Sequence, residues 1–216
     1  MNEERAKKVA EILLNAKAVT LDTKKGYRYA SGILSPIYTD NRMLMGFVKE
    51  RRVIIEEFIN LIKEKKLEFD VAAGTATAGI SWAAWIAEKL SKPMIYVRGK
   101  AKEHGKGKAV EGLIKKGQKV LVVEDLISSG GSSIDSINSL KEEGAEVVAV
   151  IAIFSYELKK AKENFAEAKT NYFYLTDFKA LVGTAKEKKY LSEEEKNKVL
   201  EWNSNPDAWE KKAELK

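Results

Sequence analysis

The spacing of hydrophobic residues predicts two kinds of secondary structure along this chain. An i, i+3, i+4, i+7 pattern of apolar positions predicts helices over residues 3–16 and 46–66. Short apolar runs predict strands that are buried on both faces of a sheet, at residues 69–73, 94–97, 120–123, 146–154 and 172–175. Helical spacing returns after three of these runs, near residues 80–90, 134–144 and 157–169.

The order of these elements predicts an α/β fold. Strands and helices alternate from residue 46 to about 190, so we expect a mainly parallel twisted sheet with helices on both faces. Residues 19–41 before it contain short β-rich pieces separated by glycine and proline. We expect a single domain over residues 1–216, made of an N-terminal helix and β-rich segment (1–45), an α/β core (46–190) and a helical tail (191–216).

The tail begins with a helix-start signal. Ser192 and Glu195 have the spacing of a capping box, in which each side chain bonds the other residue's backbone N–H. Trp202 and Trp209 are expected to pack this tail on the body of the protein.

The segment 120–133, with the sequence VLVVEDLISSGGSS, combines features that suit a sugar phosphate. A turn of small residues, Ser128–Ser132, would expose backbone N–H groups at a helix start, where they can bind a phosphate. Glu124 and Asp125 would repel that phosphate, but ionised carboxylates accept hydrogen bonds from the vicinal hydroxyls of a ribose. An ordinary strand–turn–helix with capping serines is the alternative for the turn taken alone.

Two more loops follow predicted strands. Residues 74–79 have the glycine spacing of a nucleoside-triphosphate loop, but Ile80 stands where that motif needs lysine, so only a general anion site remains. Residues 98–112 are rich in glycine and basic residues and include the sole histidine, His104. A mobile basic loop could close over a diphosphate leaving group and neutralise its charge. All three loops leave the carboxyl ends of strands, where ligands bind in such sheets.

Composition narrows the function further. The chain has no cysteine, which excludes disulfides and thiolate chemistry, and no apolar run of membrane-spanning length. Its formal net charge is +6, but the lysines alternate with glutamates as on a solvated helix surface, so we expect no nucleic-acid partner. Acidic and basic residues interrupt the N-terminal segment, which is unlike a secretory signal, and we expect a cytoplasmic protein.

Segment 120–133 resembles the phosphoribosyl-diphosphate signature of type I phosphoribosyltransferases, in which four apolar residues precede two acids and a Gly/Ser/Thr loop. It is most similar to the version in orotate phosphoribosyltransferases, where EDLISSGGS or a close variant is usual. Residues 31–38 resemble the SG-x-x-SP-x-Y segment of the same family, and residues 98–105 resemble its R-K-x-A-K-x-H-G loop. The resemblance covers nearly the whole chain.

The resemblance implies a reaction and its participants. It implies transfer of ribose 5-phosphate from 5-phosphoribosyl 1-diphosphate (PRPP) to orotate with Mg²⁺, giving orotidine 5′-monophosphate and pyrophosphate in de novo pyrimidine (UMP) biosynthesis. The small β-rich N-terminal segment would be a hood over the base, and loop 74–79 would hold the pyrophosphate. The loop over 98–112 would reach the neighbouring subunit's site, which implies a homodimer with shared active sites.

The implied site residues are as follows. The catalytic residues are Lys102, His104 and Asp125. The PRPP-binding residues are Arg98, Lys102, His104, Glu124, Asp125, Leu126, Ile127, Ser128, Ser129, Gly130, Gly131 and Ser132. Ser128 would also contact orotate, and Mg²⁺ would be held through the substrate rather than by direct protein ligands.

The chain departs from the family pattern at three positions, of which two leave the grip on orotate open and one concerns a phosphate contact. Ala30 stands where some relatives have lysine, and Tyr156 stands where many have an arginine that contacts the base carboxylate. Gly99 occupies the second basic position of the loop motif, with Lys100 beside it. Two alternatives remain. One is a phosphoribosyltransferase for a purine or another base, since such enzymes share the phosphate loop, and the other is a non-catalytic regulator that keeps the fold and senses PRPP.

Overall fold

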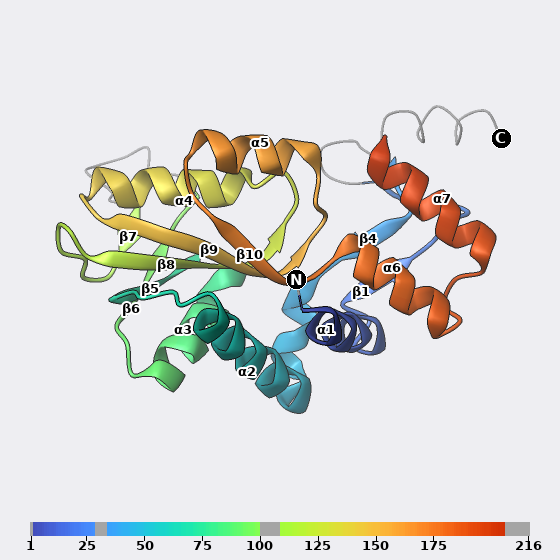
Figure 1. The fold of residues 1–216 in the computed structure, drawn as a ribbon, viewed down its shortest axis with the longest axis horizontal. Helices are drawn as coiled ribbons and strands as arrows, with labels where there is room; N and C mark the ends of the chain where they lie inside the picture. Colours follow the sequence, from blue (N-terminus) through green and yellow to red (C-terminus); the bar gives the residue numbers. More distant parts are fainter. Residues whose placement is uncertain (1, 29–33, 100–108, 206–216) are drawn as a thin grey trace. The chain divides into compact units, whose positions relative to one another are not determined.

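The computed structural model describes residues 2–28, 34–99 and 109–205. The chain forms two compact units, one made of Met1–Val48 with Thr176–Lys216 and the other of Lys49–Leu175. Strand β10 (Tyr172–Asp177) carries the chain from the second unit back into the first (Figure 1). The predicted single-domain subdivision at residues 45 and 190 stays a prediction.

The unit Lys49–Leu175 is built on a six-stranded sheet with the order β10-β9-β8-β5-β6-β7. The pairs β5–β6, β5–β8 and β8–β9 are parallel, and β6–β7 is antiparallel. The strands are β5 (Val71–Thr75), β6 (Met94–Val97), β7 (Val110–Glu111), β8 (Lys119–Ile127), β9 (Glu146–Ser155) and β10. The predicted mainly parallel sheet is confirmed.

Helices cover both faces of this sheet, as predicted (Figure 1). One face carries α2 (Val48–Glu64) and α3 (Ala78–Leu90), and the other carries α4 (Gly131–Glu142) and α5 (Lys159–Glu167). Val120 to Val123 are fully buried, and Val120 and Val122 join Ile137 and Phe165 in the core beneath α4 and α5. On the other face Trp82 is fully buried and its ring lies 6.4 Å from that of Phe58.

Several predicted boundaries were wrong around the loops. Strand β8 does not end at Val123 but continues to Ile127, because β9 keeps pairing with it: Glu124 lies opposite Ala152, and Leu126 opposite Phe154. Helix α4 begins at Gly131 rather than at Ile134. The apolar pattern starts only at Ile134, but the small residues before it fit the first helical turn, whose N–H groups have no partner within a helix.

The other two loops are also shorter than predicted. Strand β5 continues to Thr75 and α3 begins at Ala78, so only two residues separate them. The segment 98–112 is not all loop, because Val110 and Glu111 form β7 opposite Val97 and Tyr96.

The unit that contains both ends of the chain has helices and two small antiparallel strand pairs. The pairs are β1 (Val19–Leu21) with β4 (Ile37–Thr39), and β2 (Tyr27–Arg28) with β3 (Leu34–Ser35). The helices are α1 (Glu3–Asn15), the 3₁₀ helix η1 (Asn41–Gly46), α6 (Phe178–Glu187) and α7 (Glu193–Ser204). The β-rich N-terminal segment and the capping box of Ser192 and Glu195 are confirmed.

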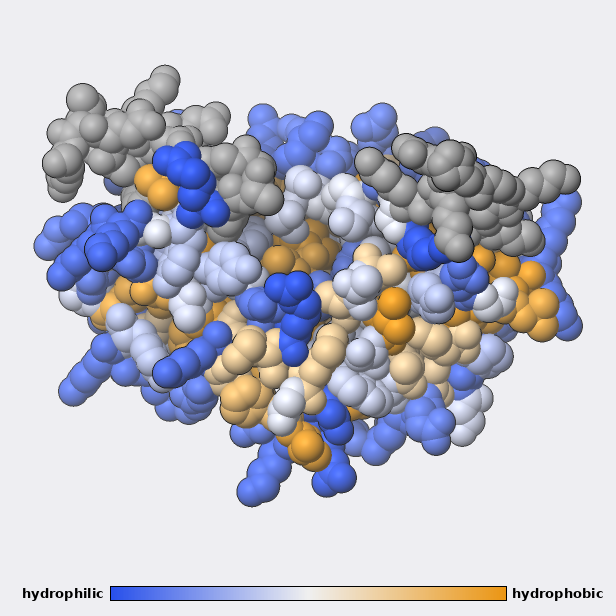
Figure 2. Space-filling model, turned by 180° about the vertical axis from the view of Figure 1, so that it is seen from behind, coloured by the Kyte–Doolittle hydropathy of each residue, from blue (hydrophilic) through white to orange (hydrophobic). Residues whose placement is uncertain are grey.

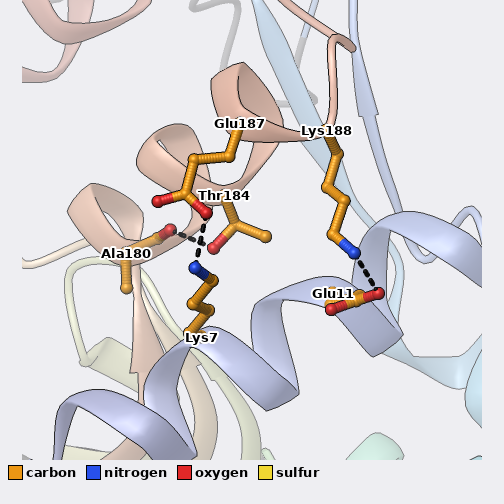
Figure 3. Close-up of polar contacts among 6 residues, drawn as sticks. All are labelled: Lys7, Glu11, Ala180, Thr184, Glu187 and Lys188. Atoms are coloured by element: carbon orange, nitrogen blue, oxygen red, sulfur yellow. Dashed lines mark hydrogen bonds and ion pairs between the residues drawn. The ribbon is translucent and has the colours of Figure 1, made fainter.

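Helix α6 was missed from the sequence and packs against α1. Two ion pairs join the helices: Lys7 Nζ lies 2.5 Å from Glu187 Oε2, and Lys188 Nζ, just after α6, lies 2.6 Å from Glu11 Oε1 (Figure 3). Thr184 donates its hydroxyl hydrogen to a carbonyl one turn earlier in α6, at 2.8 Å. These two ion pairs are solvent-exposed and lie at the margin of the contact, while apolar residues such as Val9 and Leu181 are buried.

The surface is mostly hydrophilic on the side that Figure 2 shows, with smaller hydrophobic areas between charged side chains. The tail's SEEEKNK sequence gives Lys196–Glu193 and Lys198–Glu194 pairs, at 3.0 and 2.7 Å. The predicted alternation of paired charges is confirmed there. No helix in the described part of the chain is long and apolar enough to cross a membrane.

Candidate active site

The predicted site lies where the connections of the sheet change direction. From β5 the chain moves through α3 to β6, and from β8 it moves through α4 to β9, on the opposite side of the β5–β8 pair. A crevice at such a switch point, beyond the carboxyl ends of the strands, is where open α/β sheets bind ligands. Strands β5 and β8 are in register, with Gly74 opposite Val123, so Thr75, the last residue of β5, and Glu124 of β8 lie at the same level.

The two predicted carboxylates occupy different environments. The side chain of Glu124 is buried, with 5% of its surface exposed, and Ser133 Oγ donates to its Oε1 at 3.2 Å. Burial raises the pKa of Glu124 to about 8, the charge of Asp125 adds to the rise, and hydrogen bonds from Ser133 and Thr75 oppose it. Asp125 is partly exposed. Asp125 is therefore the more accessible of the two carboxylates for a ligand.

The small-residue turn after β8 presents the start of α4. Gly130 takes a left-handed conformation, with φ of +79°, which glycine adopts without steric cost and which ends the turn. No side chain among the described residues caps α4, so its first N–H groups are available to an anion. Ser128, Gly131 and Ser132 are exposed, and Ser129 is partly so. The predicted phosphate-binding residues thus come together at one helix start.

The β5–α3 connection lies against this strand. Gly79, in the first turn of α3, packs so closely on β8 that a Cβ at this position would overlap the carbonyl oxygen of Val123. Thr75, at the end of β5, has its Oγ1 3.1 Å from Ser136 Oγ in α4, and both side chains are buried. The short connection predicted to bind an anion therefore begins beside the two carboxylates.

Arg98 is located at the same edge, directly after β6. Its guanidinium Nη2 lies 3.0 Å from Glu111 Oε1, and its backbone N–H donates to the carbonyl of Ala109 at 2.9 Å. Val97, the last residue of β6, lies opposite Thr75 of the neighbouring strand β5. Arg98 therefore follows β6 at the level where β5 ends. The side chain is thus already fixed at the rim where the basic loop begins.

The structure leaves part of the predicted site untested. Lys100, Lys102, His104 and Ala30 lie outside the described residues. Tyr156 is buried: its ring packs edge-on against Phe154 at 5.0 Å, and its N–H donates to the carbonyl of Ile127 at 3.0 Å.

Sequence reasoning missed the hydroxyl groups behind the carboxylates. Thr75, Ser133 and Ser136 come from a strand end and from the buried face of α4, and together they link β5, β8 and α4. For Ser133 and Ser136 the sequence offers one signal: serine on the apolar side of a predicted helix needs a hydrogen-bond partner when it is buried.

Known proteins are similar in sequence to this chain over almost its whole length. Residues 48–187 match the family model described as phosphoribosyl transferase domain. The orotate phosphoribosyltransferase of Coxiella burnetii is 51% identical over 206 residues, which cover 95% of this chain and 99% of that protein. The orotate phosphoribosyltransferase of Listeria innocua is 50% identical over 205 residues, which cover 95% and 98%.

The chain belongs to the orotate phosphoribosyltransferase family.

Solved structures agree with this membership. The crystal structure of orotate phosphoribosyltransferase from Aeropyrum pernix has a TM-score of 0.74 at 28% identity, and covers 85% of this chain and 99% of that one. The UMP synthase of Leishmania donovani, at 24% identity, shares the fold with a TM-score of 0.79 and covers 92% of this chain and 42% of that one. The predicted orotate phosphoribosyltransferase family, its fold and its enzyme class are confirmed.

Proposed function

We propose that this chain transfers ribose 5-phosphate from PRPP to orotate, in the pyrimidine biosynthesis that leads to UMP. The observation that carries the proposal is the junction of β8 with α4, where an accessible carboxylate, a small-residue turn and an uncapped helix start follow one another. The carboxylate suits the ribose diol, and the turn and helix start suit the 5-phosphate.

Each part of the site has a role in the reaction. The bond between the anomeric carbon and the diphosphate oxygen breaks, its electron pair leaves with the diphosphate, and a deprotonated ring nitrogen of orotate bonds to that carbon. Positive charge grows on the ribose, where Asp125 and Glu124 would hold the hydroxyls. Negative charge grows on the diphosphate, which Arg98, Lys102 and His104 would stabilise. Catalysis rests on positioning and electrostatics, without a covalent nucleophile.

The residues that the structure describes suit a magnesium ion brought by the substrate. Among them, no group of three or more acidic, histidine or cysteine side chains could hold a metal. Mg²⁺ usually keeps several waters and binds substrate phosphates. The diphosphate of PRPP and water would therefore hold the ion, without direct protein ligands. The bound ion would neutralise charge on the diphosphate.

The proposed working form is a cytoplasmic homodimer in which Lys102 and His104 act in the partner's site. This can be tested by mixing Lys102→Ala and Asp125→Asn subunits, each inactive alone. Random exchange would give mixed dimers with one intact site and restore about a quarter of the activity. A mixture as inactive as its components would refute shared sites.

The reaction is tested by the ultraviolet absorbance of orotate mixed with the protein, PRPP and Mg²⁺. Loss of the orotate band that depends on Mg²⁺ and is reversed by pyrophosphate is the expected result. Hypoxanthine, guanine, adenine and uracil are run in parallel. Conversion of one of these instead of orotate would favour a different base specificity, and PRPP binding without conversion of any base would favour a regulator.

A further inference from the structure

Helix α5 contacts the back of the turn that follows β8. Asn164, in the middle of α5, donates from Nδ2 to the carbonyl oxygen of Ser129 at 2.9 Å. The two residues are 35 positions apart in the sequence, so this bond is a tertiary contact. Asparagine is among the weaker helix formers, and the contact gives a physical reason for its place inside a nine-residue helix.

The neighbouring residue on α5 holds the same turn by packing. A Cβ at Gly130 would come within 2.9 Å of Phe165 Cε2, so the ring lies directly against the turn's backbone. Phe165 is buried and stacks on Tyr172, with ring centroids 4.2 Å apart and an angle of 18° between the planes. The turn is therefore supported from behind by an aromatic pair as well as by a hydrogen bond.

The hydrogen bond fixes the orientation of the peptide group between Ser129 and Gly130. In a planar trans peptide the carbonyl of one residue and the N–H of the next point in opposite directions. Because Asn164 holds the Ser129 carbonyl toward α5, the Gly130 N–H is turned away from α5. This N–H belongs to the turn proposed to bind the 5-phosphate.

We propose that Asn164 is a positioning residue for the 5-phosphate site, one that fixes the Ser129–Gly130 peptide so that its N–H faces the phosphate. The inference rests on the proposed function of this turn. Asn164 acts through the peptide and does not touch the substrate itself. Its loss should weaken the grip on the phosphate and leave the orotate contacts and the chemical step in place.

Steady-state kinetics of the full chain test this role. Asn164→Ala and Asn164→Asp both remove the donor, and the second keeps the side chain's size in case the first folds poorly. Both should raise the KM for PRPP about tenfold, the change expected from losing one hydrogen bond, with kcat and the KM for orotate within about threefold of wild type. Asn138→Ala removes an exposed asparagine from the neighbouring helix α4 and should change none of these three constants.

Calorimetric binding of ribose 5-phosphate separates this inference from the proposed function. Weaker binding by both Asn164 variants supports the role of Asn164 whether or not the wild type converts orotate. An active wild type whose variants keep its KM for PRPP and its ribose 5-phosphate affinity would overturn the inference alone. Equal losses of kcat and thermal stability without a selective rise in that KM would also overturn it. A wild type that neither converts orotate nor binds ribose 5-phosphate would overturn both proposals.

Discussion

The hydroxyl of Ser133 donates to the carboxyl of Glu124 at 3.2 Å and so joins the first turn of α4 to strand β8. This bond lies in a buried environment that raises the pKa of Glu124 from an ordinary 4.5 to about 8. A carboxyl group in such a place prefers its protonated form. Stability and pH are therefore linked through this one side chain.

We expect the free energy of unfolding to fall as pH rises from about 4.5 to 8. Across this range the unfolded chain releases the Glu124 proton while the folded chain keeps it, so rising pH favours unfolding. The loss would be on the order of 5 kcal/mol once both forms are ionised. Glu124→Gln, which is neutral at every pH, should lack this loss and be the more stable protein above pH 8. Urea denaturation of both proteins from pH 5 to 9 measures it, and parallel profiles would contradict the prediction.

Gly79→Ala should destabilise the fold by about 1–3 kcal/mol, because the added methyl group would overlap the Val123 carbonyl and push α3 away from β8. Gly183 offers a matched control inside helix α6, since a Cβ there meets nothing within 4 Å. Gly183→Ala should stabilise by up to about 1 kcal/mol through helix propensity. Urea denaturation of the two variants compares them directly, and equal effects would show that Gly79 has room for a side chain.

Lys102→Ala should lower turnover at least ~100-fold, because losing one preorganised charge contact to the leaving diphosphate costs about 3 kcal/mol. Lys106→Ala removes the same charge from the same segment and should stay within a few-fold of wild type. Initial rates with saturating orotate and PRPP make the comparison. A Lys102 variant that retains nearly full turnover would remove this residue from the catalytic role.

Trp202→Phe should lower the free energy of unfolding by about 1–3 kcal/mol. The indole Nε1 donates to the carbonyl of Leu34 at 3.0 Å, and the substitution leaves that oxygen without this donor. Tyr190→Phe is the matched control, since it removes an exposed hydrogen bond to Asn15 and should change stability by less than about 0.5 kcal/mol. Similar losses in both variants would mean that burial does not decide the cost.

The sequence was sufficient to locate those elements that an apolar pattern or a capping residue marks. Strand β6 over residues 94–97 and the capping box of Ser192 were located correctly, because each depends on neighbouring residues alone. The ends of β8 and α4 were not, since the pairing of Glu124 and Leu126 with β9 decides where that strand stops. Pairing of this kind is tertiary and leaves no mark in a local pattern.

The candidate site likewise contains residues that could be predicted from the sequence and residues that could not. Its motif residues were recognisable because a turn of small residues after a buried strand has a chemical meaning of its own. Asn164 was not recognisable, since a polar residue in an amphipathic helix is expected to face water. The burial of Glu124 was also beyond reach, because it depends on how Ser133 and Thr75 meet around it.

The order of the strands has a consequence for how the protein acquires its activity. Strand β8 pairs with β5, although β6 and β7 intervene in the chain between them. Contacts between residues so distant in sequence require closure of a long loop and form slowly, while helices form quickly from local contacts. During refolding, helical signal should therefore return before substrate affinity does. A nascent chain that has not yet added β8 has no site, however much of its helix content is in place.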